Sequence, residues 1–231
     1  MTVENGNPYQ GTPEWLAERC GYMTASNAYK VLSRTKAGKP LADYEKYCNQ
    51  LIAERLTGLT TEVFFSKEMQ WGTEHEDEAR QTYALLTNPM SLETTGFIKH
   101  PRIEYLGASP DGLVDDDGLV EIKCPNTSTH IERLRSGEIP EMYRFQMSIQ
   151  LICTGRKWCD FVDFDPRIEN PKAKIMIKRF TLDDKERADI ETKCLEFLQK
   201  VKDEYDRVCQ NDTENDTNDT ENDTEDEIIA F

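Results

Sequence analysis

The fold depends most on the stretch Ser109-Pro110-Asp111-Gly112, which is followed by Glu121-Ile122-Lys123. Between them, Asp115-Asp116-Asp117-Gly118 is a strong turn signal, because Asp and Gly tolerate the backbone conformations that tight turns require. We therefore expect one strand from Ile103 to Ala108 and another from Leu119 to Cys124, joined through this turn. Asp111 then lies at the end of one strand, and the Glu-Ile-Lys segment lies on the next.

Side-chain alternation puts Glu121 and Lys123 on the same face of the second strand, because they are two residues apart. Val120 and Ile122 point to the other face, where we expect a core. Together with Asp111, two carboxylates and one ammonium group converge at the rim of a sheet. Hard cations such as Mg2+ bind through carboxylate and carbonyl oxygens. A metal-bound water has a lowered pKa, and a nearby ammonium can orient it or stabilise charge at phosphorus. These are the groups that phosphodiester hydrolysis needs.

A surface hairpin with solvated charges is the alternative interpretation of this pattern. Taken alone, an Asp followed by Glu-x-Lys is weak support for a site, and roughly one such match in ten is functional. The surrounding Ser-Pro-Asp-Gly and the β-rich flanks favour the catalytic interpretation.

The rest of the chain alternates between helical and strand patterns. The clearest helical period runs from Tyr44 to Leu56 and is ended by Gly58. Further helices are expected at residues 13–20, 27–33, 66–87, 128–136, 140–154 and 183–208, and further strands at residues 92–99, 157–165 and 173–180. This order predicts a mixed α/β domain with a central sheet flanked by helices.

Glu76 is a candidate for a further metal ligand. On a helix it shares a face with Ala79, Tyr83 and Leu86, which are apolar or aromatic. A carboxylate on such a face is costly to bury unless it is paired or binds a metal.

Several basic and hydroxyl side chains are candidates for phosphate contacts. Arg19 offers a planar guanidinium suited to phosphate. Ser26 lies at a predicted helix N-terminus, where free N–H groups favour anions. On these two residues alone, a surface arginine and a routine N-cap are the simpler explanation. Lys36, in the basic loop 34–39, and Lys67 would contact the backbone or a groove if the substrate is duplex DNA.

Composition restricts the class of protein. The 231 residues are 37% hydrophobic and 31% charged, as in ordinary globular proteins. No stretch approaches the ~20 apolar residues of a membrane span, and no signal peptide is visible, so we expect a cytoplasmic location. The seven cysteines include no Cys-x-x-Cys and the three histidines no His-x-x-x-His, which argues against a disulfide framework and a zinc site.

The charge is unevenly distributed along the chain. The net charge is −16, which taken alone argues against nucleic-acid binding. Residues 211–231, however, are a low-complexity Asn-Asp-Thr-rich segment with nine acidic residues and no basic one, which leaves about −7 elsewhere. We expect a single nuclease domain over residues 1–210 and an acidic, weakly ordered tail over residues 211–231.

An ordered series of motifs over residues 13–170 resembles the phage lambda exonuclease family, the YqaJ-like viral recombinases of the PD-(D/E)xK nuclease superfamily. The motifs are weak apart and specific together: Trp15…Arg19-x-Gly21-x-x-Thr24-Ala25-Ser26, Trp71-Gly72…Glu76, Ser109-Pro110-Asp111-Gly112-Leu113, Glu121-Ile122-Lys123-Cys124-Pro125, Tyr143…Gln146 and Asp165-Pro166-Arg167. The resemblance implies a restriction-endonuclease-like core.

The resemblance also implies a role for each matching residue. The metal would be held by Asp111, Glu121 and the Ile122 carbonyl, with Glu76 as a further ligand, and Lys123 would orient the attacking water. The 5′-phosphate would be bound by Arg19, Ser26 and Ser109, together with Gln146.

Two positions of this comparison have more than one interpretation. Gln146 matches a glutamine beside the site, but the family tends to have Gln-x-Gln there, so either Gln146 or Gln150 serves. Met69 lies where the family places an apolar wedge that parts the strands, and it is equally compatible with a core position.

By this resemblance the protein is a processive exonuclease that uses Mg2+, with Mn2+ as a substitute. It would digest one strand of linear duplex DNA from 5′ to 3′, release mononucleotides and leave a 3′ single strand. Its partners would be DNA ends, two further copies in a ring-shaped homotrimer, and a single-strand annealing protein that uses the overhang for recombination. The alternatives are an endonuclease of the same superfamily and, least favoured, a non-catalytic DNA-end-binding scaffold.

Overall fold

The computed structural model describes residues 10–61 and 67–215, without the side chains of residues 68, 69 and 211–215. A five-stranded sheet with the order β2-β5-β6-β7-β8 lies at the centre of the molecule. Strands β6 and β7 are parallel, and the other neighbouring pairs are antiparallel. The predicted mixed sheet is therefore confirmed. Its strands are β2 (Leu92–Glu93), β5 (Gly112–Val114), β6 (Gly118–Lys123), β7 (Trp158–Phe164) and β8 (Ile175–Thr181).

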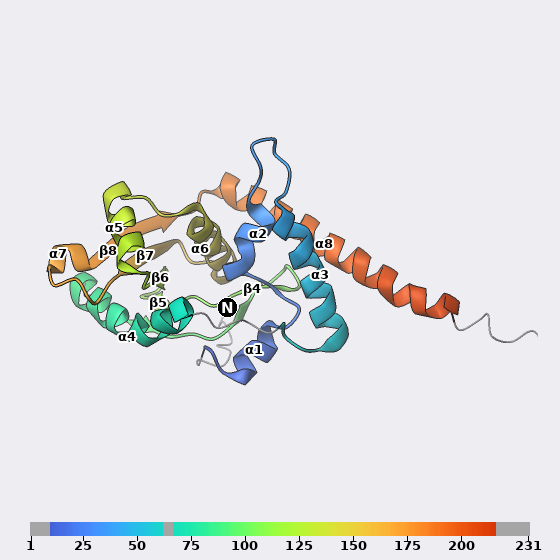
Figure 1. Cartoon of the computed structure of the whole chain (residues 1–231), viewed down its shortest axis with the longest axis horizontal. Helices are drawn as coiled ribbons and strands as arrows, with labels where there is room; N and C mark the ends of the chain where they lie inside the picture. Colours follow the sequence, from blue (N-terminus) through green and yellow to red (C-terminus); the bar gives the residue numbers. More distant parts are fainter. Residues whose placement is uncertain (1–9, 62–66, 216–231) are drawn as a thin grey trace, which may run out of the picture.

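Helices flank this sheet, as predicted. Helix α4 packs against β6 and β7 on one side, and α5 and α6 lie on the other (Figure 1). The helical elements are α1 (Pro13–Arg19), the 3-10 turn η1 (Ala25–Asn27), α2 (Ala28–Leu32), α3 (Ala42–Thr57), α4 (Lys67–Thr87), α5 (Thr127–Ser136), α6 (Glu141–Thr154), α7 (Pro171–Lys174) and α8 (Asp184–Asn215).

The alternation of side chains along β6 explains why both faces of the sheet are covered. Val120 and Ile122 pack in one apolar cluster with Tyr83 of α4. Leu119 points the other way and packs in a second cluster with Met147 of α6. Burial of each such side chain stabilises the fold by roughly 1.5–3 kcal/mol. Glu121 and Lys123 share the face of Leu119, so they point toward α6 rather than toward open solvent.

A second, three-stranded sheet was not predicted. It has the order β1-β4-β3, formed by β1 (Met23–Thr24), β4 (Leu106–Ala108) and β3 (Ile98–Lys99). It packs with α2, α3, α6 and α8 around the largest apolar cluster of the chain. Helix α3 confirms the periodic segment predicted from Tyr44, and it ends at Gly58 in the left-handed conformation, with φ +68°.

Two predicted strands are wrong in extent. The single strand expected at residues 92–99 is two short strands, β2 and β3, which belong to different sheets. The strand expected from Ile103 is shorter and begins at Leu106. Tyr105 has φ +59°, a left-handed conformation that a regular strand does not contain. The partner of β6 in the hairpin is consequently β5, since β4 lies in the other sheet.

Two further boundaries differ from the prediction because of local capping. Residues 27–33 form the end of η1 and the five-residue α2, so the predicted N-cap of a single helix is absent. Residues 173–174 belong to α7, which Asn170 caps through its side chain, and β8 starts at Ile175.

Helix α8 continues to Asn215 and so passes residue 210, the predicted limit of the body. Its C-terminal half projects away from the rest of the molecule (Figure 1). The remainder of the predicted acidic tail, residues 216–231, lies outside the described residues. Within the described ranges, no helix has the length and apolar character needed to cross a bilayer.

We predict that Gly118→Ala destabilises the protein. A Cβ at residue 118 would lie 2.1 Å from the Trp158 ring of the neighbouring strand, so the ring would have to move. Such overpacking costs about 1–3 kcal/mol, measurable as a lower midpoint of urea unfolding. Gly72→Ala is the control, because nothing lies within 4 Å of a Cβ there. Equal stabilities of the two variants would contradict the prediction.

Candidate active site

Glu121 is a completely buried carboxylate at the centre of the candidate site. Its Oε1 accepts a hydrogen bond of 2.6 Å from Gln146 Nε2, and its Oε2 accepts one of 2.5 Å from Gln150 Nε2. Lys123 Nζ also contacts Oε1. Both Gln146 and Gln150, between which the family comparison left the choice open, therefore contact Glu121. Their spacing of four residues puts them on the same face of α6.

Asp111 lies directly before β5, within the reach of β6. Its Oδ2 accepts a hydrogen bond of 2.7 Å from the Ile122 backbone N–H. Burial raises the pKa of Asp111 well above its usual value, and the nearby Glu121 raises it further. Two carboxylates at low solvent exposure carry more negative charge than one lysine neutralises. The arrangement therefore favours an additional cation.

Glu76 of α4 is partly buried and is held by Arg80, whose role the sequence analysis missed. Arg80 Nη2 donates to Glu76 Oε1 at 2.5 Å and to the Asp111 carbonyl at 3.0 Å. Burial raises the pKa of Glu76, although Arg80 opposes this effect. The spacing of four residues on one helix was the signal that could have identified Arg80. The predicted apolar face is correct for Ala79 and Tyr83, but Leu86 is 61% exposed because α4 extends beyond the core.

The residues of this cluster fit a hard divalent cation. Mg2+ takes one or two carboxylates and completes its coordination with waters and substrate phosphates. Asp111 and Glu121 supply two carboxylates, and their donor atoms are oxygens, as Mg2+ prefers. In the described part of the chain, no three His, Cys, Asp or Glu side chains are already gathered around one metal position. Glu76 would have to leave Arg80 to become a third ligand.

Lys123 keeps its positive charge at this position. Burial by itself would lower the pKa of its ammonium group, but Glu121 and Asp111 outweigh burial and hold the pKa above its usual value. The Tyr143 ring lies 5.4 Å from Lys123 Nζ and covers the cation from the side of α6. The ammonium is thus fixed between a carboxylate and an aromatic ring.

A second buried charge cluster lies beside Lys123, on the neighbouring strand. Asp163 contacts His130 Nδ1 at 2.5 Å and also contacts Arg133. His130 Nε2 lies 2.8 Å from the Ala173 carbonyl, so both ring nitrogens face oxygen acceptors. The cluster ties α5 to β7, and no sequence motif pointed to it because its members are far apart along the chain.

Arg19 is a cation whose partners are neutral. Its guanidinium lies 3.3 Å from the hydroxyls of Ser26 and Ser109, and 4.0 Å from the centre of the Trp15 ring. Trp15 Nε1 also donates to Ser109 at 3.0 Å. Burial lowers the pKa of Arg19 to about 10, so it remains charged at neutral pH. Among the described residues, no carboxylate forms a salt bridge with it.

The structure brings Arg19, Ser26 and Ser109 together, but it changes the argument for Ser26. The predicted helix N-terminus is a 3-10 turn followed by five helical residues, and it shows no side-chain cap. Ser26 is exposed and its hydroxyl faces Arg19. Any affinity for an anion would come from the guanidinium rather than from a helix dipole.

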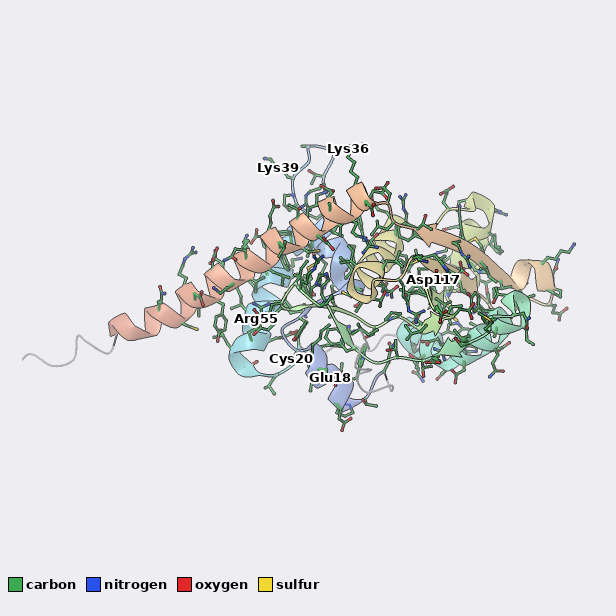
Figure 2. All side chains as sticks on the ribbon, turned by 180° about the vertical axis from the view of Figure 1, so that it is seen from behind. Glu18, Cys20, Lys36, Lys39, Arg55 and Asp117 are labelled. Atoms are coloured by element: carbon green, nitrogen blue, oxygen red, sulfur yellow. The ribbon has the colours of Figure 1, made fainter. Side chains whose placement is uncertain are left out.

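Two of the predicted DNA contacts, Lys36 and Lys67, form no described interaction with the carboxylate cluster. Lys36 is at the tip of a loop that stands out on the opposite side of the molecule from α1 (Figure 2). Lys67 is exposed at the first residue of α4. Met69 is in α4, but its side chain lies outside the described residues. None of these positions contacts the carboxylate cluster in a described interaction, and their role in DNA binding stays a prediction.

The motif Asp165-Pro166-Arg167 folds over the end of α4. Arg167 donates to Asp165 Oδ1 at 2.7 Å and to Oδ2 at 3.0 Å, and its guanidinium lies 4.4 Å from the Trp71 ring centre. Burial alone would raise the pKa of Asp165, but hydrogen bonds from Arg167 and Thr127 hold it at about 2. The contact of Arg167 with Trp71 links two motifs that are distant in sequence.

The fold places the chain among nuclease-like α/β proteins. The crystal structure of an alkaline exonuclease, LHK-Exo from Laribacter hongkongensis, is 40% identical with a TM-score of 0.81, over 88% of this chain and 99% of that one. LHK-Exo in complex with dAMP is 41% identical with the same TM-score and coverage. A phage-related exonuclease from Haemophilus somnus 129PT shares the fold, with 15% identity and a TM-score of 0.59, over 82% of this chain and 96% of that one.

The family model of the YqaJ-like viral recombinase domain matches residues 14–157. The chain belongs to the YqaJ-like viral recombinase family. The resemblance inferred from the ordered motifs is thereby confirmed. No protein with a curated function matches the sequence.

We predict that Asp165→Asn destabilises the protein at neutral pH and that this difference shrinks in acid. The folded pKa of about 2 lies below the model-peptide value of 3.8, so the carboxylate stabilises the fold above pH 4 and loses this effect as pH falls toward 2. The unfolding free energy of Asp165→Asn should be lower than that of the wild type by about 2 kcal/mol at pH 7 and by roughly half of that at pH 3. Urea titrations at both values measure it. A difference that does not change with pH would contradict the assignment.

Proposed function

We propose that this protein is a divalent-metal-dependent exonuclease that digests one strand of linear duplex DNA from its 5′ end. The observation that carries the proposal is the position of Arg19. Among the described residues, its side chain donates hydrogen bonds to hydroxyls and to no carboxylate, and one of these hydroxyls belongs to Ser109, two residues before Asp111. An anion site next to a carboxylate cluster would bind the terminal 5′-phosphate and so place the adjacent phosphodiester at the carboxylates.

The coarser activity, a DNA exonuclease of the viral recombinase family, is supported by the relatives. An alkaline exonuclease is 40% identical over 99% of its own length, and its structure with dAMP contains a nucleoside monophosphate. The polarity, the processivity and the choice of Mg2+ are parts of our proposal, which rest on the family resemblance and the site.

The metal would be held by Asp111, Glu121 and the Ile122 carbonyl, with Glu76 as a further carboxylate once it leaves Arg80. When bound, such an ion lowers the pKa of a water and offsets charge at the phosphorus. The chain's own residues fix the rest of the geometry. Gln146 and Gln150 hold the Glu121 carboxylate in one orientation through 2.6 and 2.5 Å hydrogen bonds.

Lys123 is the group that would position the attacking water. Its ammonium is a hydrogen-bond donor only, so it orients a water through the water's oxygen and stabilises negative charge on the phosphate. Glu121 and Asp111 keep it protonated, since they hold its pKa above the usual value.

The proposal includes assembly and a partner. We infer a homotrimer around the DNA and an annealing protein that takes up the 3′ strand, both from the family resemblance. Exposed apolar side chains at the end of α4 support a contact between copies. Leu85, Leu86 and Met90 are 84%, 61% and 91% exposed, and grouped apolar side chains of this kind often mark interfaces.

We predict that Lys123→Ala lowers the rate of Mg2+-dependent digestion by about 10²–10⁴-fold while the protein remains folded, because water positioning and charge stabilisation are lost together. Release of mononucleotides from a linear duplex measures the rate. Lys185→Ala, an exposed lysine on α8, is the control and should digest at the wild-type rate.

The same assay separates the proposal from an endonuclease. A closed circular plasmid should remain intact with the wild-type protein and Mg2+, and a chelator should stop digestion of the linear form. Cleavage of the circle would favour the endonuclease, and full activity of Lys123→Ala would refute the mechanism.

We predict that the wild-type protein prefers a 5′-phosphorylated duplex over a 5′-hydroxyl duplex by about 10- to 100-fold, the range expected for hydrogen bonds to a charged group. Arg19→Gln should lose this preference, while Arg207→Ala, an exposed arginine on α8, should keep it. The ratio of the two initial rates is measured within each variant, so differences in folded fraction cancel. An unchanged ratio in Arg19→Gln would remove the role of Arg19.

A further inference from the structure

Aromatic and cationic side chains alternate along one side of the three-stranded sheet. Starting from Arg19, the Phe97 ring centre lies 5.7 Å from the guanidinium, and the Tyr22 ring lies 5.3 Å from Phe97. The Tyr105 ring lies 5.3 Å from Tyr22 and 3.9 Å from the Arg55 guanidinium. We call these residues, with Lys99 at 5.4 Å from the Tyr22 ring, the aromatic–cationic row.

Three unusual backbone features build this row. Gly21 has φ +73°, and a Cβ there would lie 2.8 Å from Arg55 Cγ. Gly107 has no room for a Cβ, because the Phe97 ring would be 2.2 Å away. Tyr105 is a bulky residue in the left-handed region, at φ +59°. Of the three, Tyr105 alone is strained, because glycine adopts positive φ without steric cost. Strain at a bulky residue persists where the surroundings hold it and is concentrated at functional sites. Here all three positions serve the same surface.

The cations of the row are not neutralised. Within the described residues, Arg19, Lys99 and Arg55 form no salt bridge. Arg55 donates its Nε–H to the Gly21 carbonyl at 3.0 Å, and its Nη2 has no hydrogen-bond partner in the described part. Two carboxylates weaken the positive potential of the row: against the effect of burial, which lowers both pKa values, Glu104 raises the pKa of Arg55, and Glu54 raises that of Arg19. Arg55 and α1 lie on the same side of the molecule in Figure 2.

The row is open enough to receive a ligand. Tyr105 is 36% exposed, Lys99 is exposed, and Tyr22 and Arg55 are half-buried, whereas Phe97 is only 3% exposed and supports the others from below. Arg55 lies over the Tyr105 ring and Lys99 over the Tyr22 ring, so each ring is only partly open. Partly open aromatic rings next to cations that lack a carboxylate partner suit single-stranded nucleic acids, since bases stack on rings and phosphates contact the cations. An apolar peptide would leave the cations unpaired, so single-stranded DNA is the better match.

The position of the row indicates which DNA it receives. Strand β4 runs from Leu106 next to Tyr105 to Ala108 next to Ser109, so the row leads from the phosphate site away from Asp111, over roughly 13 Å at the usual rise of a strand. We propose that the aromatic–cationic row binds a single-stranded 5′ extension of the duplex. This inference rests on the proposed function, because Arg19 marks where the 5′-terminated strand leaves the carboxylate cluster, and in a tailed duplex an internal phosphate takes the place of the terminal one there.

Binding without catalysis tests the inference. A fluorescent duplex with a six-thymidine 5′ tail is compared with a blunt duplex and with a tail of abasic nucleotides, by anisotropy in the presence of a chelator. The wild-type protein should bind the thymidine-tailed duplex about tenfold more tightly than the blunt duplex, the scale expected for one stacked base. The abasic tail should increase the affinity by less than the thymidine tail does.

The variants separate stacking from folding. Tyr105→Asn removes the ring and suits the left-handed backbone, so it should fold and lose the preference for the tail. Tyr105→Phe should retain the preference, Lys99→Ala should weaken it, and Lys185→Ala should not change it. If Tyr105→Asn binds the tailed duplex as tightly as the wild type, the inference is wrong.

Digestion measured separately keeps the two proposals distinguishable. If the wild-type protein digests blunt ends but gains nothing from the tail, this inference fails and the proposed function stands. If no end is digested with Mg2+ but the Tyr105-dependent preference is present, the proposed function fails and the row remains a DNA-binding surface.

Discussion

Glu121 has no exposed surface, and its carboxylate is held by two glutamine amides and one lysine beneath α6. A charge in this position is tolerated only if it is paired and hydrogen-bonded on every side, because desolvation of an unpaired carboxylate costs several kcal/mol. The surrounding structure follows from this requirement. Helix α6 must present glutamines at a spacing of four residues, and β6 must place its lysine two residues after the glutamate.

The same requirement explains why the sheet is covered on both faces. If the face of Glu121 were open to water, water could hydrogen-bond the carboxylate in place of the glutamines. Water would also compete with the carboxylate oxygens as a ligand of the metal. Burial of Leu119 against Met147 on that face, and of Val120 against Tyr83 on the other, fixes β6 between two helical layers. The carboxylates then meet at the sheet edge in a setting of low dielectric constant, where electrostatic interactions with a cation or a phosphate are stronger than in water.

In our proposal, recognition of the DNA end depends on a different part of the molecule. Arg19 ends α1 and Ser26 lies in η1, next to Ser109 at the end of β4 of the three-stranded sheet, whereas Asp111 and Glu121 belong to the β5–β6 hairpin of the five-stranded sheet. The two sheets are joined where β4 leads through Ser109 to Asp111 and β5. This short connection sets the separation between the phosphate site and the carboxylate cluster. In our proposal it is the feature that makes the activity specific for DNA ends.

From the sequence by itself, the mixed α/β class, the helix from Tyr44 and the convergence of Asp111, Glu121 and Lys123 could be predicted. Each depends on local spacing: side chains alternate on a strand, and turns need Asp and Gly. Only the tertiary structure decided that β4 and β5 lie in different sheets, that both Gln146 and Gln150 contact Glu121, and that Arg80 donates to the Asp111 carbonyl. It also decided that His130, Arg133 and Asp163 form one buried cluster. These contacts join residues from separate elements, and the left-handed Tyr105 that interrupts a predicted strand is held by Arg55 from α3. Local spacing carries no information about such distant partners, because burial and packing between elements set them.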